Sequence, residues 1–310
     1  MNDRLTSGIK YGILNANDLH LTCWRNFMKR FFSLFCAVLL FAGCAPQRAA
    51  TDGRLTVYTS FYAMEDFAKT VGGDLITLTN LVPAGTEAHD WEPGPRDLAG
   101  LEQADVFLYN SDDMEHWVDS LEDQLEKKEI LVVETADGLE DDADDPHVWL
   151  NPANALIQMQ RICDAFCEKD SANADAYRQN LEEAAEKIRT LDEKYRSALA
   201  GVSHRELVVT HGAYGYLASA YGLSQLAIEG MQGTSDPSPA QMAKMIEEIK
   251  EKGIGCIFYE ADGESKIAES IAKECSIMTA PLNPFEGDAK GRDYFSVMEE
   301  NLEYLEQGLK

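Results

Sequence analysis

Short apolar runs alternate with helical patterns through most of the chain. Before residue 151, four runs of five to eight residues are rich in β-branched and aromatic side chains, as is typical of buried strands. They are residues 55–61, 75–82, 106–110 and 130–134. Because parallel neighbours need long crossover connections, this alternation predicts a mostly parallel sheet with helices on both faces.

The pattern changes between residues 151 and 203. Two helical stretches meet near Asp170 and Ser171, and the second continues to about Ala200 without Gly or Pro. At 1.5 Å per residue, a helix of about thirty residues extends roughly 45 Å, which is longer than one domain usually needs. We interpret it as a rigid helix that connects two parts of the protein.

After this helix the alternation of strands and helices returns. Residues 206–211, 223–230, 255–260 and 276–283 have strand patterns. Asp236 and Pro237 are expected to start a helix that continues to Lys250, and a closing helix is expected from Phe295 to Leu309. The sequence therefore predicts an α/β fold of two lobes with parallel sheets, joined by a long backbone helix. The N-terminal lobe is expected at residues 54–150, the helical region at 151–203 and the C-terminal lobe at 204–310.

The first 43 residues are not expected to be part of the fold. From Met28 the chain reads MKRFFSLFCAVLLFAGC, which has two cations, an apolar run, small residues and then Cys44. This pattern indicates a secretory signal, and Cys after Ala-Gly resembles the lipobox of bacterial lipoproteins, although Phe41 stands where Leu is usual. The alternative, a membrane-anchoring helix, is disfavoured because spanning a bilayer takes about 20 apolar residues. We expect residues 1–43 to be an upstream extension and signal peptide, and 44–53 a polar tether.

Composition narrows the possible partners. The chain of 310 residues is 45% hydrophobic, which is enough for proper cores, and its formal net charge is -27. Nucleic acid would be repelled, whereas cations are natural partners.

The acidic segment 140–145 is expected to be a solvated loop. Cys163 and Cys167 are expected to be small core residues, and disulfide bonds between cysteines remain an alternative.

Three of the six histidines lie at junctions between a predicted element and a loop. His89 follows the second strand, His147 precedes a helix in DDPHVWLNP, and His211 ends ELVVTH, where Gly212 is expected to open the next helix. In open α/β sheets, ligand sites form beyond the carboxyl ends of strands, so such residues can converge. Glu286, in the LNPFEG turn after the last strand, fits the same logic. Three neutral imidazoles and one carboxylate form a donor set that suits Zn²⁺.

The motifs in combination resemble those of a known family. They are AHDWEPGPRDL, ADVFLYNSDDMEHWVDSL, DPHVWLNP, VVTHGAYGYLASAYGL, DPSPAQMAKMIEEIKEKGI, FYEADGESKIAESIAKE and LNPFEG. In this order, over residues 53–310, the chain resembles the metal-binding lipoproteins of ABC-type zinc and manganese uptake transporters.

The resemblance implies two lobes, a linking helix and one metal ion buried in the cleft between the lobes. It implies that His89, His147 and His211 are ligands. Many members of the family have Asp as the fourth ligand, but the zinc branch of Gram-positive bacteria has Glu in an LNPxEG turn, and Glu286 matches that branch. Many zinc members carry a His-rich loop before the second ligand, whereas this chain has an acidic segment there.

The function expected from this resemblance is extracytoplasmic Zn²⁺ capture and delivery to an ABC permease. The expected protein is a monomer and not an enzyme, lipid-anchored to the outer face of the bacterial cytoplasmic membrane, or periplasmic in a Gram-negative cell. Mn²⁺ is the alternative cargo, but manganese members typically replace the third histidine with a carboxylate. A zinc hydrolase is less favoured because the chain has no HExxH motif, and a metal-stabilised surface adhesin because no sequence feature points to it.

Other polar residues lie near the candidate ligands in sequence or are histidines themselves. Glu92, Asp145 and Glu260 are candidates to orient imidazole N–H groups, with helix capping as the alternative. His116, expected at the start of a helix, and His204, in a polar turn, are expected at the surface rather than as ligands.

The lipobox-like motif generates the first prediction. Cys44→Ala should abolish lipidation and release the protein from the membrane, because the acyl chain is attached to that side chain. Labelling with a fatty-acid probe, together with membrane fractionation, measures both effects. A mutant that still takes up the probe would refute the assignment.

Overall fold

The computed structural model describes residues 53–139, 145–228, 237–261, 263, 265–287 and 289–310. The signal segment, Cys44, nearly all of the tether and most of the acidic loop lie outside the described residues. No helix in the described part is long and apolar enough to cross a membrane.

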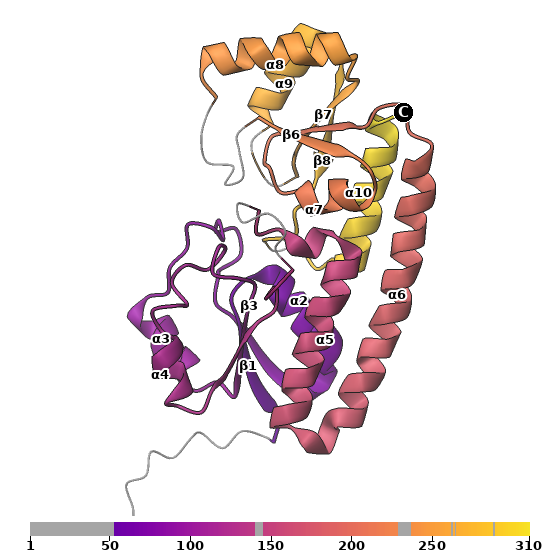
Figure 1. The fold of residues 1–310 in the computed structure, drawn as a ribbon. Coiled ribbons are helices and arrows are strands. Elements are labelled where there is room, and N and C mark those ends of the chain that lie inside the picture. Colours follow the sequence, from indigo (N-terminus) through magenta and orange to yellow (C-terminus); the bar gives the residue numbers. More distant parts are fainter. Residues whose placement is uncertain (1–52, 140–144, 229–236, 262, 264, 288) are drawn as a thin grey trace, which may run out of the picture. The chain divides into compact units, whose positions relative to one another are not determined.

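The first sheet contains four parallel strands in the order β2-β1-β3-β4. These are β1 (Leu55–Thr59), β2 (Ile76–Asn80), β3 (Val106–Tyr109) and β4 (Leu131–Glu134). The crossovers contain α2 (Tyr62–Gly72), α3 (Pro95–Leu101) and the short α4 (Glu122–Glu126). Figure 1 shows α3 and α4 on one side of this sheet, with α2 and the later helix α5 (Pro152–Lys169) on the other.

The second sheet repeats this topology, with the order β6-β5-β7-β8 and all strands parallel. Its strands are β5 (Glu206–Val209), β6 (Ser224–Ala227), β7 (Cys256–Glu260) and β8 (Met278–Leu282). Its helices are α7 (Gly215–Ala220), α8 (Pro239–Lys252), α9 (Lys266–Cys275) and α10 (Tyr294–Gly308). Each apolar run predicted as a strand contains one, so the predicted fold of two parallel α/β lobes is confirmed.

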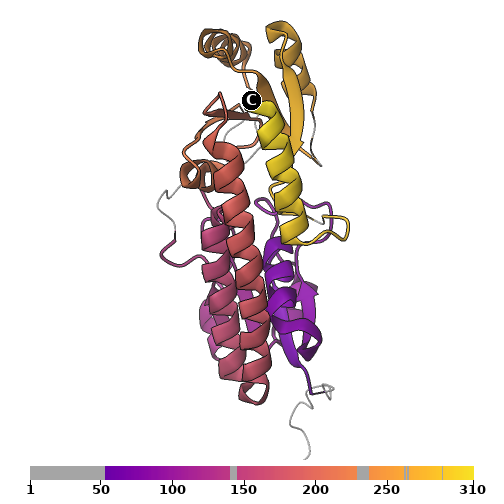
Figure 2. The same ribbon diagram turned by 90° about the vertical axis from the view of Figure 1, so that its right-hand side faces the viewer.

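A helical hairpin joins the two sheets. Asn151 caps α5 by accepting the Ala153 N–H, and Pro152 occupies the first turn, where no N–H is needed. Helix α6 (Ala174–Ala200) has 27 residues and therefore extends roughly 40 Å. It packs on α5, α2 and α10, and Figure 2 shows it running alongside elements of both lobes. The Tyr195 hydroxyl in α6 donates a 2.7 Å hydrogen bond to the Met298 carbonyl in α10.

Three helix starts differ from the sequence predictions. Helix α8 begins at Pro239 because Ser238 forms a capping box with Gln241, so Asp236 and Pro237 precede the cap. Around His116 the chain forms turns, and α4 begins only at Glu122. Gly212 lies in a turn before α7.

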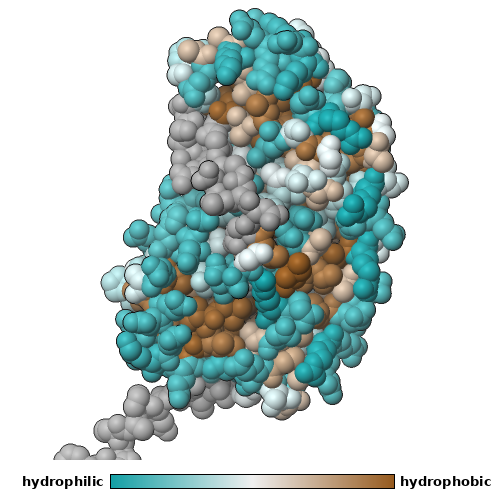
Figure 3. Space-filling view, in the orientation of Figure 1, coloured by the Kyte–Doolittle hydropathy of each residue, from teal (hydrophilic) through white to brown (hydrophobic). Residues whose placement is uncertain are grey.

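The hydrophobic core is continuous between the two lobes. One cluster of buried side chains includes Val57 of the first sheet and Leu207 of the second, together with Trp149 before α5 and Phe285 and Tyr294 after β8. Among the described residues, Ile157 and Met278 are the exposed large hydrophobic side chains. The apolar patches visible in Figure 3 therefore consist mainly of partly buried residues.

Candidate metal centre

The four residues predicted to bind a metal all follow the carboxyl ends of strands. His89 lies between β2 and α3, and His147 follows β4. His211 comes two residues after β5, and Glu286 four residues after β8. Because the carboxyl ends of parallel strands share one edge of a sheet, the loops after them can meet in the crevice beyond that edge.

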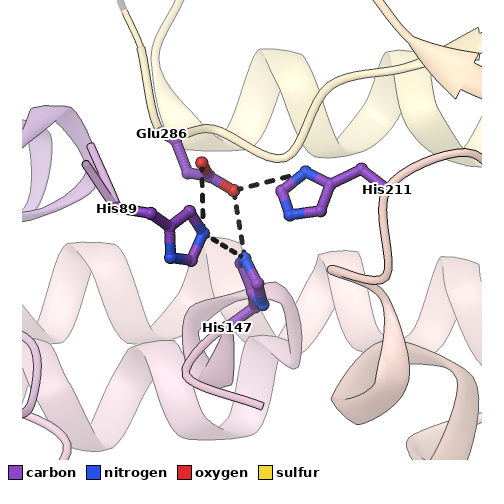
Figure 4. Close-up of side chains that lie close together, drawn as sticks. All are labelled: His89, His147, His211 and Glu286. Atoms are coloured by element: carbon purple, nitrogen blue, oxygen red, sulfur yellow. Dashed lines mark hydrogen bonds and ion pairs between the residues drawn. The ribbon is translucent and has the colours of Figure 1, made fainter. Parts of the chain in front are cut away.

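The structure brings these four side chains together, as Figure 4 shows. One nitrogen or oxygen from each lies within 4.8 Å of the others. Nε2 of His147 is 3.1 Å from Nε2 of His89 and 3.2 Å from Oε1 of Glu286. Oε2 of Glu286 is 3.7 Å from Nε2 of His89, and its Oε1 is 3.9 Å from Nδ1 of His211. Metal–ligand bonds of about 2.0–2.1 Å place tetrahedral donors about 3.3 Å apart, so the spacing suits one tetrahedral ion.

Water has little access to this cluster. The exposed fractions of the four side chains are 0% for His147, 4% for His211, 5% for His89 and 6% for Glu286. Interactions between charges are therefore weakly screened here, and any buried charge has to be paired.

The pKa values reflect both burial and proximity. Burial lowers the pKa of His89 to about 4. Burial also opposes charge on His147, but hydrogen bonds to Asp145 and Glu286 outweigh it and raise the pKa of His147 above its ordinary value. Burial alone would raise the pKa of Glu286, yet the neighbouring histidines hold it at about 2. Glu286 is therefore a carboxylate at any physiological pH.

Asp145 determines the orientation of the His147 ring. Its Oδ1 accepts hydrogen bonds from Nδ1–H of His147, at 2.7 Å, and from the His147 main-chain N–H, at 3.0 Å. A carboxylate only accepts, so Nδ1 carries a proton, and Nε2, which faces the cluster, is the nitrogen left to bind a metal once it is unprotonated. A Cβ on Gly215, at the start of α7, would collide with Oδ2 of Asp145, so glycine there leaves room for this carboxylate.

Of the other two residues expected to orient imidazoles, Glu260 lies near the cluster and Glu92 does not. Oε2 of Glu260, at the end of β7, lies 3.5 Å from Nδ1 of His211, the same nitrogen that faces Glu286, so Glu260 stands beside the cluster and does not hold the opposite nitrogen of that ring. Glu92 is exposed, and the described contacts do not bring it to His89. Instead Glu87, which the sequence analysis did not single out, accepts a hydrogen bond from the His89 main-chain N–H at 3.4 Å. Its only sequence signal is its position two residues before a candidate ligand.

Two further histidines named in the sequence analysis stay outside the cluster. His116 is exposed in a turn. His204 is partly exposed, and its main-chain N–H donates to the Leu309 carbonyl. Chemically, three imidazoles and one carboxylate can complete the coordination of a borderline ion such as Zn²⁺ without water.

Known proteins share both the sequence pattern and the fold. The model of the family described as "Zinc-uptake complex component A periplasmic" matches residues 57–308. The zinc-binding lipoprotein AdcA of Streptococcus pneumoniae is 35% identical over 296 residues, which covers 88% of this chain and 59% of AdcA. The high-affinity zinc uptake system protein ZnuA of Bacillus subtilis is 33% identical over 307 residues, covering 90% of this chain and 96% of ZnuA.

A solved structure of a related protein has a similar fold and sequence. The crystal structure of the Zn(II)-bound ZnuA-like domain of Streptococcus pneumoniae AdcA matches with a TM-score of 0.75 and 34% identity. The match covers 83% of this chain and 99% of that domain. This chain therefore spans about 59% of the AdcA lipoprotein but nearly all of its ZnuA-like domain.

The contact between Asp145 and His147 generates a prediction. Asp145→Asn should weaken binding of Zn²⁺ between about 10-fold and 100-fold, because the charged acceptor that fixes the His147 tautomer is lost. Glu92→Gln is the matched control and should bind as the unmodified protein does, since Glu92 is exposed. Competition with a chromophoric chelator measures both affinities. Equal losses in the two variants would mean that the effect is one of general charge.

Proposed function

Since the chain belongs to the family of zinc-uptake complex component A, periplasmic, whose model covers residues 57–308, we propose that it captures Zn²⁺ outside the cytoplasm. It delivers the ion to the permease of an ABC-type importer. The Zn²⁺ ion is cargo, so no chemical turnover is involved, and the protein acts as a monomer without nucleic acid.

The observation that carries this proposal is the buried set of three imidazoles and one carboxylate. In the proposal, His89, His147, His211 and Glu286 are the four ligands. Imidazole donors favour Zn²⁺ over Mn²⁺ on ligand softness and on the general order of metal affinities, whereas Mn²⁺ prefers six oxygen donors. Mn²⁺ is therefore the less favoured cargo.

A hydrolytic role fits the same geometry less well. A catalytic zinc site keeps one position open for water and needs a general base nearby. Four ligands from the protein would complete a tetrahedral site. The proposed role is therefore binding and delivery.

The proposed location follows from the amino-terminal sequence and from the relatives. The Streptococcus pneumoniae relative is named a lipoprotein. We infer that this chain is exported and held at the outer face of the cytoplasmic membrane by a lipid on Cys44, a residue outside the described part of the chain.

Thermal stability tests the proposed cargo and ligands together. A ligand that binds only the folded state stabilises it by about 4 kcal/mol at a thousandfold excess over Kd. Zn²⁺ should therefore raise the Tm strongly, and His147→Ala should lose most of that gain because the fully buried Nε2 is removed. His116→Ala and His204→Ala are the controls and should keep it. Metal analysis of protein purified without chelator, with competition by Mn²⁺, identifies the cargo; preference for Mn²⁺ would refute the proposal.

The raised pKa of His147 predicts how affinity depends on pH. Coordination needs an unprotonated Nε2, and a group whose pKa is raised holds its proton to higher pH. Affinity should thus be full above that pKa and fall as the pH drops through it, and below that pKa the binding of Zn²⁺ should release a proton from His147. His89 and Glu286, with pKa values of about 4 and 2, should add no competition near neutral pH.

Calorimetric titrations in buffers of different ionisation enthalpy measure these protons. Glu286→Gln should weaken the binding of Zn²⁺. It should also lower the pH at which the affinity falls, because the Glu286 carboxylate helps to raise the pKa of His147. Affinity that stays constant between about pH 7 and 5, with no linked protons, would contradict this assignment.

A further inference from the structure

The buried indole of Trp149 joins the loop of His147 to the loop of Glu286. Trp149 lies two residues after His147, and its indole N–H donates a 2.8 Å hydrogen bond to the Pro284 carbonyl, two residues before Glu286. The exposed fraction of Trp149 is 0%. The Tyr294 hydroxyl, from α10, donates in turn to the Trp149 carbonyl at 2.8 Å. The segments after β4 and β8 are therefore fixed to each other through this residue.

The Glu286 loop is also held by α10. The Asn283 N–H donates to Oδ1 of Asn301 in α10, and Nδ2 of Asn301 donates back to the Asn283 carbonyl, at 2.9 and 2.8 Å. These bonds anchor the loop to its own lobe. The Trp149 bond sets its position relative to His147.

Aromatic packing leaves the Trp149 ring little freedom to move. The ring centroid of Phe61, the residue before α2, is 5.0 Å from that of Trp149, and the His147 ring is 5.2 Å away. Phe285, next to Glu286, packs against Tyr294 with ring centroids 5.6 Å apart. Dense packing of this kind resists displacement of the rings, so it keeps the distances between these side chains nearly constant.

We propose that Trp149 is a positioning residue that sets the separation of His147 and Glu286 and thereby the preference of the site for a small tetrahedral ion. This inference rests on the proposed Zn²⁺ site. The 3.2 Å between Nε2 of His147 and Oε1 of Glu286 matches the spacing of about 3.3 Å that tetrahedral Zn²⁺ requires. Mn²⁺ favours six-coordinate sites rich in oxygen, which need more room and water. Loosening the link between the loops therefore lowers the affinity for Zn²⁺ more than the affinity for Mn²⁺.

The test uses Trp149→Phe in the full chain. This variant keeps a ring but removes the indole N–H, and it leaves the Pro284 carbonyl without that donor. The expected result is a loss of about tenfold in Zn²⁺ affinity with Mn²⁺ affinity largely unchanged, so the Zn²⁺ to Mn²⁺ preference falls. Co²⁺ serves as a spectroscopic probe, because tetrahedral Co²⁺ absorbs visible light more strongly than six-coordinate Co²⁺; the variant should show the weaker bands.

Tyr195→Phe is the matched control. It removes a 2.7 Å hydrogen bond that is equally buried but joins α6 to α10, away from the ligand loops. This variant should keep both the metal preference and the Co²⁺ spectrum. If Trp149→Phe does not fold, Tyr294→Phe decides the question, because it removes the hydroxyl that holds the Trp149 carbonyl and should shift the preference in the same direction.

Two results would overturn the inference. One is an unchanged Zn²⁺ to Mn²⁺ preference with an unchanged Co²⁺ spectrum in the folded variant. The second is an equal loss for both ions, which would reduce Trp149 to a structural role. Failure of the proposed function is distinguishable, because it would show in the unmodified protein as a lack of preference for Zn²⁺.

Discussion

The structure depends on holding three imidazoles and a carboxylate close together where water has little access. Nε2 of His89 and Nε2 of His147 are 3.1 Å apart, and their lone pairs repel each other unless a proton or a cation lies between them. Desolvating these polar groups is also unfavourable. A flexible scaffold would relieve both costs by letting the side chains separate. The rest of the molecule therefore has to be rigid where the ligand loops meet.

Two parallel sheets and a shared core supply that rigidity. His89 and His147 follow β2 and β4, the two edge strands of the first sheet, and the second sheet contributes His211 and Glu286. The core is continuous through Trp149, Phe285 and Tyr294, so the lobes are packed against each other as well as tethered by helices. The spacing of the four clustered side chains is consequently set by protein packing. A site formed in advance spends less binding free energy on ordering its own groups.

Most of the fold could be predicted from the sequence because buried parallel strands are apolar on both faces and stand out as short runs. The starts of α7 and α8 differ from the predicted ones because turns and caps decide them, and Ser238 caps α8 where the sequence predicts a start at Asp236 and Pro237. The four clustered residues could be named in advance, since each lies in a motif that resembles the family and stands at a junction between a predicted element and a loop.

The supporting contacts could not be predicted in the same way. Glu92 and Asp145 each lie near a candidate ligand in sequence, yet only Asp145 contacts its histidine. That contact needs the space left by Gly215, from the C-terminal lobe. The bond from Trp149 to Pro284 joins residues 135 positions apart, and a single sequence carries no local signal for it.

The arrangement of carboxylates adds an electrostatic argument for a divalent cargo. A buried ion has to be balanced by nearby opposite charge, because the penalty for an unpaired charge is several kcal/mol. The side chains of Glu286 and Asp145 are 6% and 2% exposed, and together they supply two negative charges, one that would reach an ion in the cluster directly and one that would act through the His147 ring. Glu260 stands beside His211 but is 29% exposed, so solvent screens its charge. Two buried negative charges neutralise a divalent cation and leave a monovalent one over-compensated. The pair thus favours ions of charge two, while the imidazoles and the spacing of the donors select among them.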